Sequence, residues 1–301
     1  MFNLQCQKCG TVTVYADDST YTITDTDPIR LSRKLSQKFD VMAEYLTANK
    51  LKVNNDKTHL MLMCTDQRRR KQTSTLKVMI GSTEIEVSQT ERLLGAYIHQ
   101  NMKWVEHIRN NKFSLIHSLN SRIGALKKVA KVASFKTRLS VANGIFMSKL
   151  NFMIPLWAGC AEYLASALQV CQNHAARIVT KHDKNIPVKQ LLNECGWRSV
   201  RQEMYYHTAV LVHRIITQRR PTYLYSQLTA DGSHGYQTRS STTSNIRQST
   251  SFNTSLTLCK ESFKWRGAAC YEGLPGSIRS IKNIKLFKKE LDSWVRNNIP
   301  Q

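Results

Sequence analysis

The sequence predicts an α+β protein, in which antiparallel β-hairpins plus a helix are followed by a mostly α-helical region. Before about residue 100, short segments alternate polar and apolar residues with the two-residue period of strands. From residue 104 onward, apolar residues recur at the three- and four-residue spacing of amphipathic helices. The chain has 301 residues, and we expect three parts, at 1–103, 104–155 and 156–301.

The charge balance is strongly basic. The chain contains 44 Lys and Arg against 21 Asp and Glu, which gives a formal charge of +23 and an isoelectric point near 9.9. Such an excess favours a polyanionic partner, and nucleic acid is the first candidate. An anionic membrane is the second, since no basic amphipathic helix dominates the sequence. A solvated basic surface without a partner is the alternative.

The first hairpin carries two adjacent carboxylates. Residues 11–15 and 20–24 alternate Val, Tyr and Ile with Thr, and Ala-Asp-Asp-Ser between them suits a tight turn. The charges of Asp17 and Asp18 repel unless a divalent cation lies between them. Aspartate also favours turns for a local reason, because its carboxylate accepts hydrogen bonds from nearby backbone N–H groups. The hairpin alone leaves both interpretations open.

Residues 27–49 carry the signals of an amphipathic helix. Asp27 suits the N-cap, Pro28 the first helical position and Asn49 the end. One apolar stripe follows at steps of three and four residues, formed by Leu31, Leu35, Phe39, Met42 and Leu46.

More strands are predicted before residue 104. A strand covers about 58–64, and the basic run RRRK follows it at 68–71. LKVMI and TEIEV (76–80 and 83–87) form a hairpin with a two-residue turn at Gly81-Ser82. ERLLGAYIHQ (91–100) is typical of another short strand.

The remainder of the chain is predicted to be helical. A basic helix starts at Trp104, with an apolar face formed by Trp104, Ile108, Leu115, Leu119, Ile123 and Leu126. Its cations lie elsewhere on the surface: Arg109, Lys112, Arg122, Lys127, Lys128 and Lys131. Further helices are expected at about 135–154 and 161–181, from Pro187 to Gly196, from the capping box Ser199-x-x-Gln202 to about 218, and at 283–297.

The polar stretch 231–257 has no clear period, and we expect a long loop or a pair of weak strands there. The aromatic residues of the helical region could stack on bases, but their helical spacing favours a place in the hydrophobic core. These residues are Trp157, Trp197, Trp265, Tyr205 and Tyr206.

Targeting signals are not recognised. MFNLQCQKCG lacks the pattern of a secretory signal, and the most apolar stretch, 145–157, is too short for a membrane helix. We therefore expect a protein that is neither secreted nor membrane-spanning and that resides in the nucleus, the cytoplasm or both.

Eight cysteines without a signal peptide indicate thiols in a reducing compartment. Cys6-x-x-Cys9 has no second Cys/His pair at zinc spacing, which argues against a zinc site.

The order of these segments resembles a reverse transcriptase. Tyr15-Ala16-Asp17-Asp18 on a hairpin precedes a helix, LKVNNDKTHLMLM, ERLLGAYI and a Trp-led basic helix. This order is similar to the second half of the palm and the thumb of a non-LTR (LINE-type, jockey- or CR1-like) retrotransposon polymerase. The resemblance continues through LQVCQNHAARIVT and WRGAACYEGLPGSIRSIKNIKLFKKEL and covers essentially the whole chain. It implies an RNA-directed DNA polymerase, a nucleotidyltransferase.

The resemblance implies a catalytic role for three residues. Asp17 and Asp18 would help to bind two Mg²⁺ ions that activate the primer 3′-hydroxyl and neutralise the triphosphate. Mg²⁺ suits such a site because it takes oxygen ligands and shares its coordination with substrate phosphates. Lys57 matches the palm lysine that can protonate the leaving pyrophosphate, although an exposed turn lysine is the alternative.

The resemblance also implies substrate-binding residues. Tyr15 would lie near the primer terminus, and Leu94-Gly95 match the primer-grip turn, where glycine permits a close backbone approach. A glycine at an ordinary strand bend is the alternative for that turn. Four cations would follow the phosphate backbone of the RNA template and DNA primer, unless they merely form a solvated helix face. They are Arg109, Lys127, Lys128 and Lys131.

The chain departs from the family pattern at its start. Only fourteen residues precede Tyr15, whereas in the family the fingers and a third metal-binding aspartate lie upstream. We therefore expect an N-terminally truncated copy with an incomplete Mg²⁺ site, no means of fixing a dNTP, and little or no polymerase activity alone. We also expect a better-folded part after residue 104 and an exposed edge on the first hairpin. Two other hypotheses remain: a non-catalytic basic module that binds nucleic acid, and an unrelated helical interaction protein in which YADD is an accidental turn.

Overall fold

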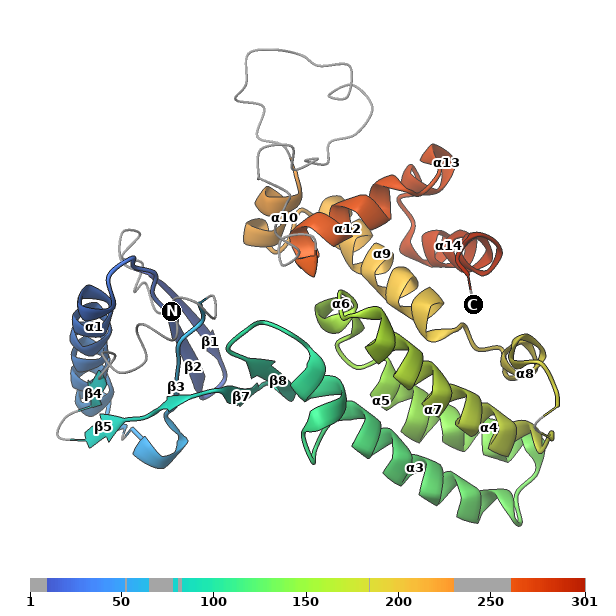
Figure 1. Cartoon of the computed structure of the whole chain (residues 1–301). Coiled ribbons are helices and arrows are strands. Elements are labelled where there is room, and N and C mark those ends of the chain that lie inside the picture. The colour runs from blue at the N-terminus through green and yellow to red at the C-terminus, as the bar shows by residue number, and fades with distance from the viewer. Residues whose placement is uncertain are drawn as a thin grey trace. The chain divides into compact units, whose positions relative to one another are not determined.

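The structure, a computed structural model, describes residues 10–51, 53–64, 78–80, 83–183, 185–229 and 261–300. The chain forms two compact units, Met1–Lys103 and Trp104–Gln301. Small sheets and one long helix make up the first unit, and helices make up the second (Figure 1). The prediction of a mixed helix and strand protein is therefore confirmed in this broad sense.

The described part of the first unit contains four two-stranded sheets and one long helix. Strands β1 (Thr11–Tyr15) and β2 (Asp18–Thr22) pair antiparallel, as do β4 (Val78–Ile80) with β5 (Thr83–Ile85) and β7 (Thr90–Leu93) with β8 (Ala96–His99). The short strands β3 (Leu60–Met61) and β6 (Val87–Ser88) pair parallel. Helix α1 covers Pro28–Ala48, and a single 3₁₀ turn, η1, covers Asn55–Lys57.

The predicted ends of α1 are confirmed. The Asp27 carboxylate accepts a hydrogen bond from the backbone N–H of Ile29 at 3.1 Å, and Pro28 opens the helix. Asn49 closes it. The helix nevertheless contains no buried residue, because its apolar stripe is only partly covered.

Two strand predictions in this unit were wrong in detail. Residues 91–100 form a hairpin rather than one strand, because the chain reverses at Leu94 and Gly95. The strand predicted at 58–64 is reduced to β3. The basic run at 68–71 and the predicted Gly81-Ser82 turn lie outside the described residues.

Apart from residues 229–262, short connections join the consecutive described helices of the second unit. Their bounds are η2 (Glu106–Asn110), α3 (Leu115–Ala130), α4 (Phe135–Ala142), η3 (Asn143–Met147), α5 (Ser148–Leu150), α6 (Ile154–Trp157), α7 (Glu162–Thr180), α8 (Val188–Cys195), α9 (Val200–Gln218), α10 (Thr222–Leu228), α12 (Phe263–Glu272), α13 (Gly276–Arg279) and α14 (Ile284–Asn298). Helices η2 and η3 are π-helical. The region predicted as a polar loop, 231–257, lies outside the described residues.

The predicted basic helix from Trp104 is two helices. Asn111 has extended backbone, and the Ser114 hydroxyl caps a new helix by accepting a hydrogen bond from the N–H of His117. The helix predicted at 135–154 also ends early, since the chain turns at 151–153 and Met153 has a left-handed backbone with φ of 57°. Helices α10, α12 and α13 were not predicted.

Other helix signals in this unit are confirmed. The Ser199 side chain and Gln202 form the predicted capping box at the start of α9, which ends at Gln218 as expected. Gly196 ends α8 with φ of 69°, a left-handed conformation that glycine adopts readily.

The second unit has two hydrophobic cores. The first packs α3, η3, α5, α7 and α8 around fully buried Leu119, Phe146 and Trp157. It spans the predicted boundary at 155, because Ile154 and Leu164 both belong to it. The second packs α9, α12 and α14 around residues such as Val212, Phe287 and Leu291. Trp157 and Trp197 are buried, which confirms the core interpretation for these two aromatics.

The first unit is packed much less densely. Among its described residues, the only buried hydrophobic ones are Leu62, Val78 and Ala96. The better packing after residue 104 is thus confirmed. Each strand of the β1–β2 hairpin has one edge that pairs with no other described strand, as expected.

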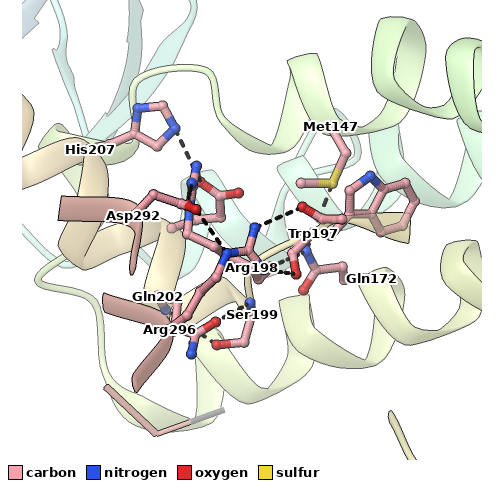
Figure 2. A network of polar contacts seen from close by, with 11 residues as sticks. Met147, Gln172, Trp197, Arg198, Ser199, Gln202, His207, Asp292 and Arg296 are labelled. Carbon is pink, nitrogen blue, oxygen red and sulfur yellow. Dashed lines mark hydrogen bonds and ion pairs between the residues drawn. The ribbon is translucent and has the colours of Figure 1, made fainter. Parts of the chain in front are cut away.

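A buried polar network joins the two cores of the second unit (Figure 2). Arg198, between α8 and α9, donates hydrogen bonds to Glu203 at 2.9 Å and to Asp292 of α14. Its backbone carbonyl accepts a hydrogen bond from Gln172 of α7 at 2.8 Å. Glu203 is only 3% exposed, so its charge depends on this pairing.

We predict that Arg198→Gln lowers the free energy of unfolding by about 3–5 kcal/mol, because it leaves the buried Glu203 carboxylate without its arginine partner and with only the imidazole of His207 nearby, at 3.3 Å. The matched control is Arg201→Gln, which breaks an exposed pair with Glu162 and should cost below about 1 kcal/mol. Urea unfolding followed by circular dichroism measures both. Equal losses in the two variants would contradict the assigned importance of the network.

Candidate functional site

The tip of the β1–β2 hairpin brings Tyr15, Asp17 and Asp18 together. The two strands pair from Thr11 opposite Thr22 to Tyr15 opposite Asp18, so the turn has only two residues, Ala16 and Asp17. Asp18 is the first residue of β2, which starts two residues earlier than the sequence predicts. Tyr15 is 65% exposed, and both carboxylates are exposed as well.

The donor atoms at this tip suit Mg²⁺ in kind but are few in number. Carboxylate oxygens are the ligands that Mg²⁺ prefers, and exposed ones keep room for water and phosphate ligands. Asp17 and Asp18 supply two carboxylates. Within the described ranges, no group of three or more His, Cys, Asp or Glu that could hold a metal ion is found. The two residues therefore fit part of a Mg²⁺ site.

The other predicted palm residues lie elsewhere in the first unit. Lys57 ends the 3₁₀ turn η1, is exposed, and its backbone N–H donates to the carbonyl of Asn54 at 3.2 Å. Leu94 and Gly95 form the two-residue turn between β7 and β8. In the part of the chain that the structure describes, no hydrogen bond or ion pair connects Lys57 or this turn with the hairpin tip.

Both turns contain a non-glycine residue in the left-handed region. Ala16 has φ of 52° and Leu94 has φ of 48°. A side chain with a Cβ is disfavoured there by roughly 1–2 kcal/mol per residue. Two-residue hairpin turns of types I′ and II′ require a positive φ at their first position, and five other described non-glycine residues also have positive φ. Both turns that the family resemblance places near the primer thus have strained backbone.

We predict that Leu94→Asn stabilises the β7–β8 hairpin by about 1 kcal/mol. Leu94 and Gly95 both have positive φ, as a type I′ turn requires, and Asn-Gly is the preferred pair for that turn. Slower hydrogen exchange of the β7 and β8 amides would measure the gain. Gly95→Ala should have the opposite effect. As a control, Leu51→Asn changes an exposed leucine whose φ is not positive, and it should not stabilise the protein.

Helix α3 presents the predicted cations to solvent. Leu119, Ile123 and Leu126 bury one face of the helix in the first core. Lys127 and Lys128 of its last turn are exposed, as is Lys131 just beyond it. Arg109 is exposed on the separate helix η2. No ion pair to any of these four cations is found among the described residues.

The surroundings of these cations are also positive. From His107 to Ala161 the chain contains nine Lys and Arg and no Asp or Glu. Burial lowers the pKa of His174 on α7, and the nearby Lys127 and Arg177 lower it further. Burial likewise lowers the pKa of His107 to about 4, with a smaller contribution from Lys149. This segment therefore lacks the acids that would offset its positive potential.

Three phenylalanines in the acid-free segment lie beside cations, a feature that the sequence analysis missed. Phe113 is 64% exposed with the Lys112 ammonium 5.1 Å from its ring centroid. Phe152 has Lys149 at 5.3 Å. Phe135 has Arg138 at 6.0 Å. Their spacing of one or three residues from a cation was the available signal.

Comparisons with models of protein families, with curated proteins and with solved structures found no match. Among the described residues, no helix is both long enough and apolar enough to cross a membrane. No disulfide joins the five described cysteines, which are Cys64, Cys160, Cys171, Cys195 and Cys270. The Cys6-x-x-Cys9 motif lies outside the described residues.

Proposed function

We propose that this chain is the second half of the palm, the thumb and the C-terminal region of a reverse transcriptase from a non-LTR retrotransposon, an RNA-directed DNA polymerase. One observation carries the proposal. Two adjacent exposed carboxylates lie at a two-residue hairpin tip, directly after an exposed tyrosine and on a strained alanine turn. An exposed pair of carboxylates can supply oxygen ligands to a divalent cation, and a polymerase uses such ligands at its catalytic centre.

In this proposal, Asp17 and Asp18 hold Mg²⁺ and Tyr15 lies against the primer end. The bound metal would supply charge neutralisation of the triphosphate and a more acidic primer 3′-hydroxyl. Lys57 donates a proton toward the leaving pyrophosphate, and the Leu94–Gly95 turn supports the primer backbone. Nucleotide positioning and a third carboxylate must come from other residues, because two exposed carboxylates do not orient a triphosphate.

The cations of the second unit have a different role in the same proposal. Arg109, Lys127, Lys128 and Lys131 neutralise phosphates of the template–primer duplex without reading its sequence. Their exposure and the absence of acids from His107 to Ala161 support this role. The buried face of α3 fixes the helix and so fixes the positions of its lysines.

Primer extension on a poly(A) template with Mg²⁺ tests the catalytic role. We expect no synthesis from this chain alone, and synthesis after fusion to a fingers and first-palm segment that carries the third carboxylate. In that fusion, Asp17→Asn should lower the rate about a hundredfold or more, since it removes a metal ligand. The control Asp40→Asn changes an exposed aspartate on α1 and should leave the rate unchanged. An active fusion that tolerates both Asp17→Asn and Asp18→Asn would contradict the proposal.

A non-catalytic function in nucleic-acid binding is the second candidate, favoured by the acid-free segment. We predict that changing Lys127, Lys128 and Lys131 together to Gln weakens duplex binding and reduces the dependence of log K on log salt by about 2–3 units. Fluorescence anisotropy at several salt concentrations measures this. The control changes Lys181, Lys189 and Arg201 to Gln, three exposed cations outside the acid-free segment, of which Arg201 pairs with Glu162. An unrelated interaction protein would show no difference between the two variants.

A further inference from the structure

A second acid-free basic segment lies at the C-terminal end of the chain. From Gly273 to Lys289 there are five Lys and Arg and no Asp or Glu. Arg279 ends α13, Lys282 lies in the connection to α14, and the other three lysines lie in the first half of α14. Lys282, Lys285 and Lys289 are exposed and Lys288 is half-buried. Among the residues that the structure describes, no ion pair to any of these four lysines is found.

The lysines of α14 are arranged so that they repel one another. Lys285, Lys288 and Lys289 stand at positions i, i+3 and i+4, which are neighbours on a helix surface, and like charges there are destabilising. The first turn of α14 contains Lys285 and no acid, although the helix dipole favours negative charge at this end. Fully buried Phe287 and Leu291 anchor the opposite face in the second core. The second core therefore fixes α14 in a position where its lysines remain close together and repel one another.

The chemistry of this surface fits a nucleic-acid duplex better than a single strand or a membrane. Proteins that bind single strands combine cations with exposed aromatic rings on which bases stack. The one aromatic residue between 273 and 289 is Phe287, which is buried. Trp294 of the same helix packs against Tyr205 with ring centroids 5.5 Å apart. Leu286 is the one exposed large apolar residue of α14, too little for membrane insertion.

We propose that Lys282, Lys285, Lys288 and Lys289 form a second nucleic-acid surface, which binds the phosphate backbone of a duplex independently of α3. This surface is not part of the proposed polymerase function and does not rest on it. It contacts phosphates only, so its binding is sequence-independent and strongly reduced by salt.

The test compares three full-length variants of equal charge with the unmodified chain. The first changes Lys282, Lys285 and Lys289 to Gln. The second, called the α3 variant, changes Lys127, Lys128 and Lys131 to Gln. The third is the control, which changes Lys181, Lys189 and Arg201 to Gln. Anisotropy of a labelled 20-base-pair duplex, a single strand of the same sequence and anionic vesicles gives the affinities. Circular dichroism confirms that the variants remain folded.

We expect the first variant to lose roughly tenfold or more in duplex affinity at moderate salt, with a salt slope smaller by about 2–3 units, while the control is unchanged. A first variant that binds duplex like the control overturns the proposal. So does a loss confined to single strands or to vesicles. Loss in the first variant with normal binding in the α3 variant supports this surface and counts against the thumb-like role of α3.

Discussion

Arg198 lies between α8 and α9, and it contacts Glu203 of α9 and Asp292 of α14. Burial opposes its charge, but the pairs with Glu203 and Asp292 raise its pKa, and its guanidinium lies 3.8 Å from the Tyr206 ring centroid. Arg296 donates to Asp292 and to the carbonyl of Gly196 at the end of α8. These contacts fix α14 to helices of the first core, so the position of the α14 lysines depends on this charge network.

The two units keep their functional side chains in place by different means. In the second unit, each basic helix face has an opposite face in a hydrophobic core. In the first unit, Asp17 and Asp18 are held by a hairpin with few buried neighbours. A two-stranded hairpin has little independent stability, so the geometry of this tip depends on additional contacts along its unpaired edges. A metal site requires fixed ligands, so the Mg²⁺ site proposed for these two carboxylates would need further ligands to hold the ion firmly.

The parts of the fold that could be predicted from the sequence are those set by interactions between residues close together in the chain. Asp27 with Pro28, Gly196, and Ser199 with Gln202 act within four residues, and the helix ends that they set were found. The hairpin carrying Asp17 and Asp18 was found for the same reason. The break at Ser114 was missed, because a serine inside an apolar period carries no clear signal. The residue pattern predicted one strand through Leu94, whereas the family resemblance had a turn at Leu94-Gly95, where the chain does reverse. The Arg198–Asp292 contact joins residues 94 positions apart, and no single-sequence pattern indicates such a pair.

The placement of charge has an energetic consequence for what this chain can do. Acids are absent from 107–161 and from 273–289, and both segments hold cations that repel one another. Some acids of the second unit already form ion pairs: Glu203 and Asp292 pair with Arg198, and Glu162 pairs with Arg201. A polyanion would therefore relieve repulsion that the protein itself leaves uncompensated, and its binding would stabilise the second unit by an amount that grows with the logarithm of its concentration above the dissociation constant. Such stabilisation requires no catalysis, which separates nucleic-acid binding by this unit from the chemistry proposed for Asp17 and Asp18.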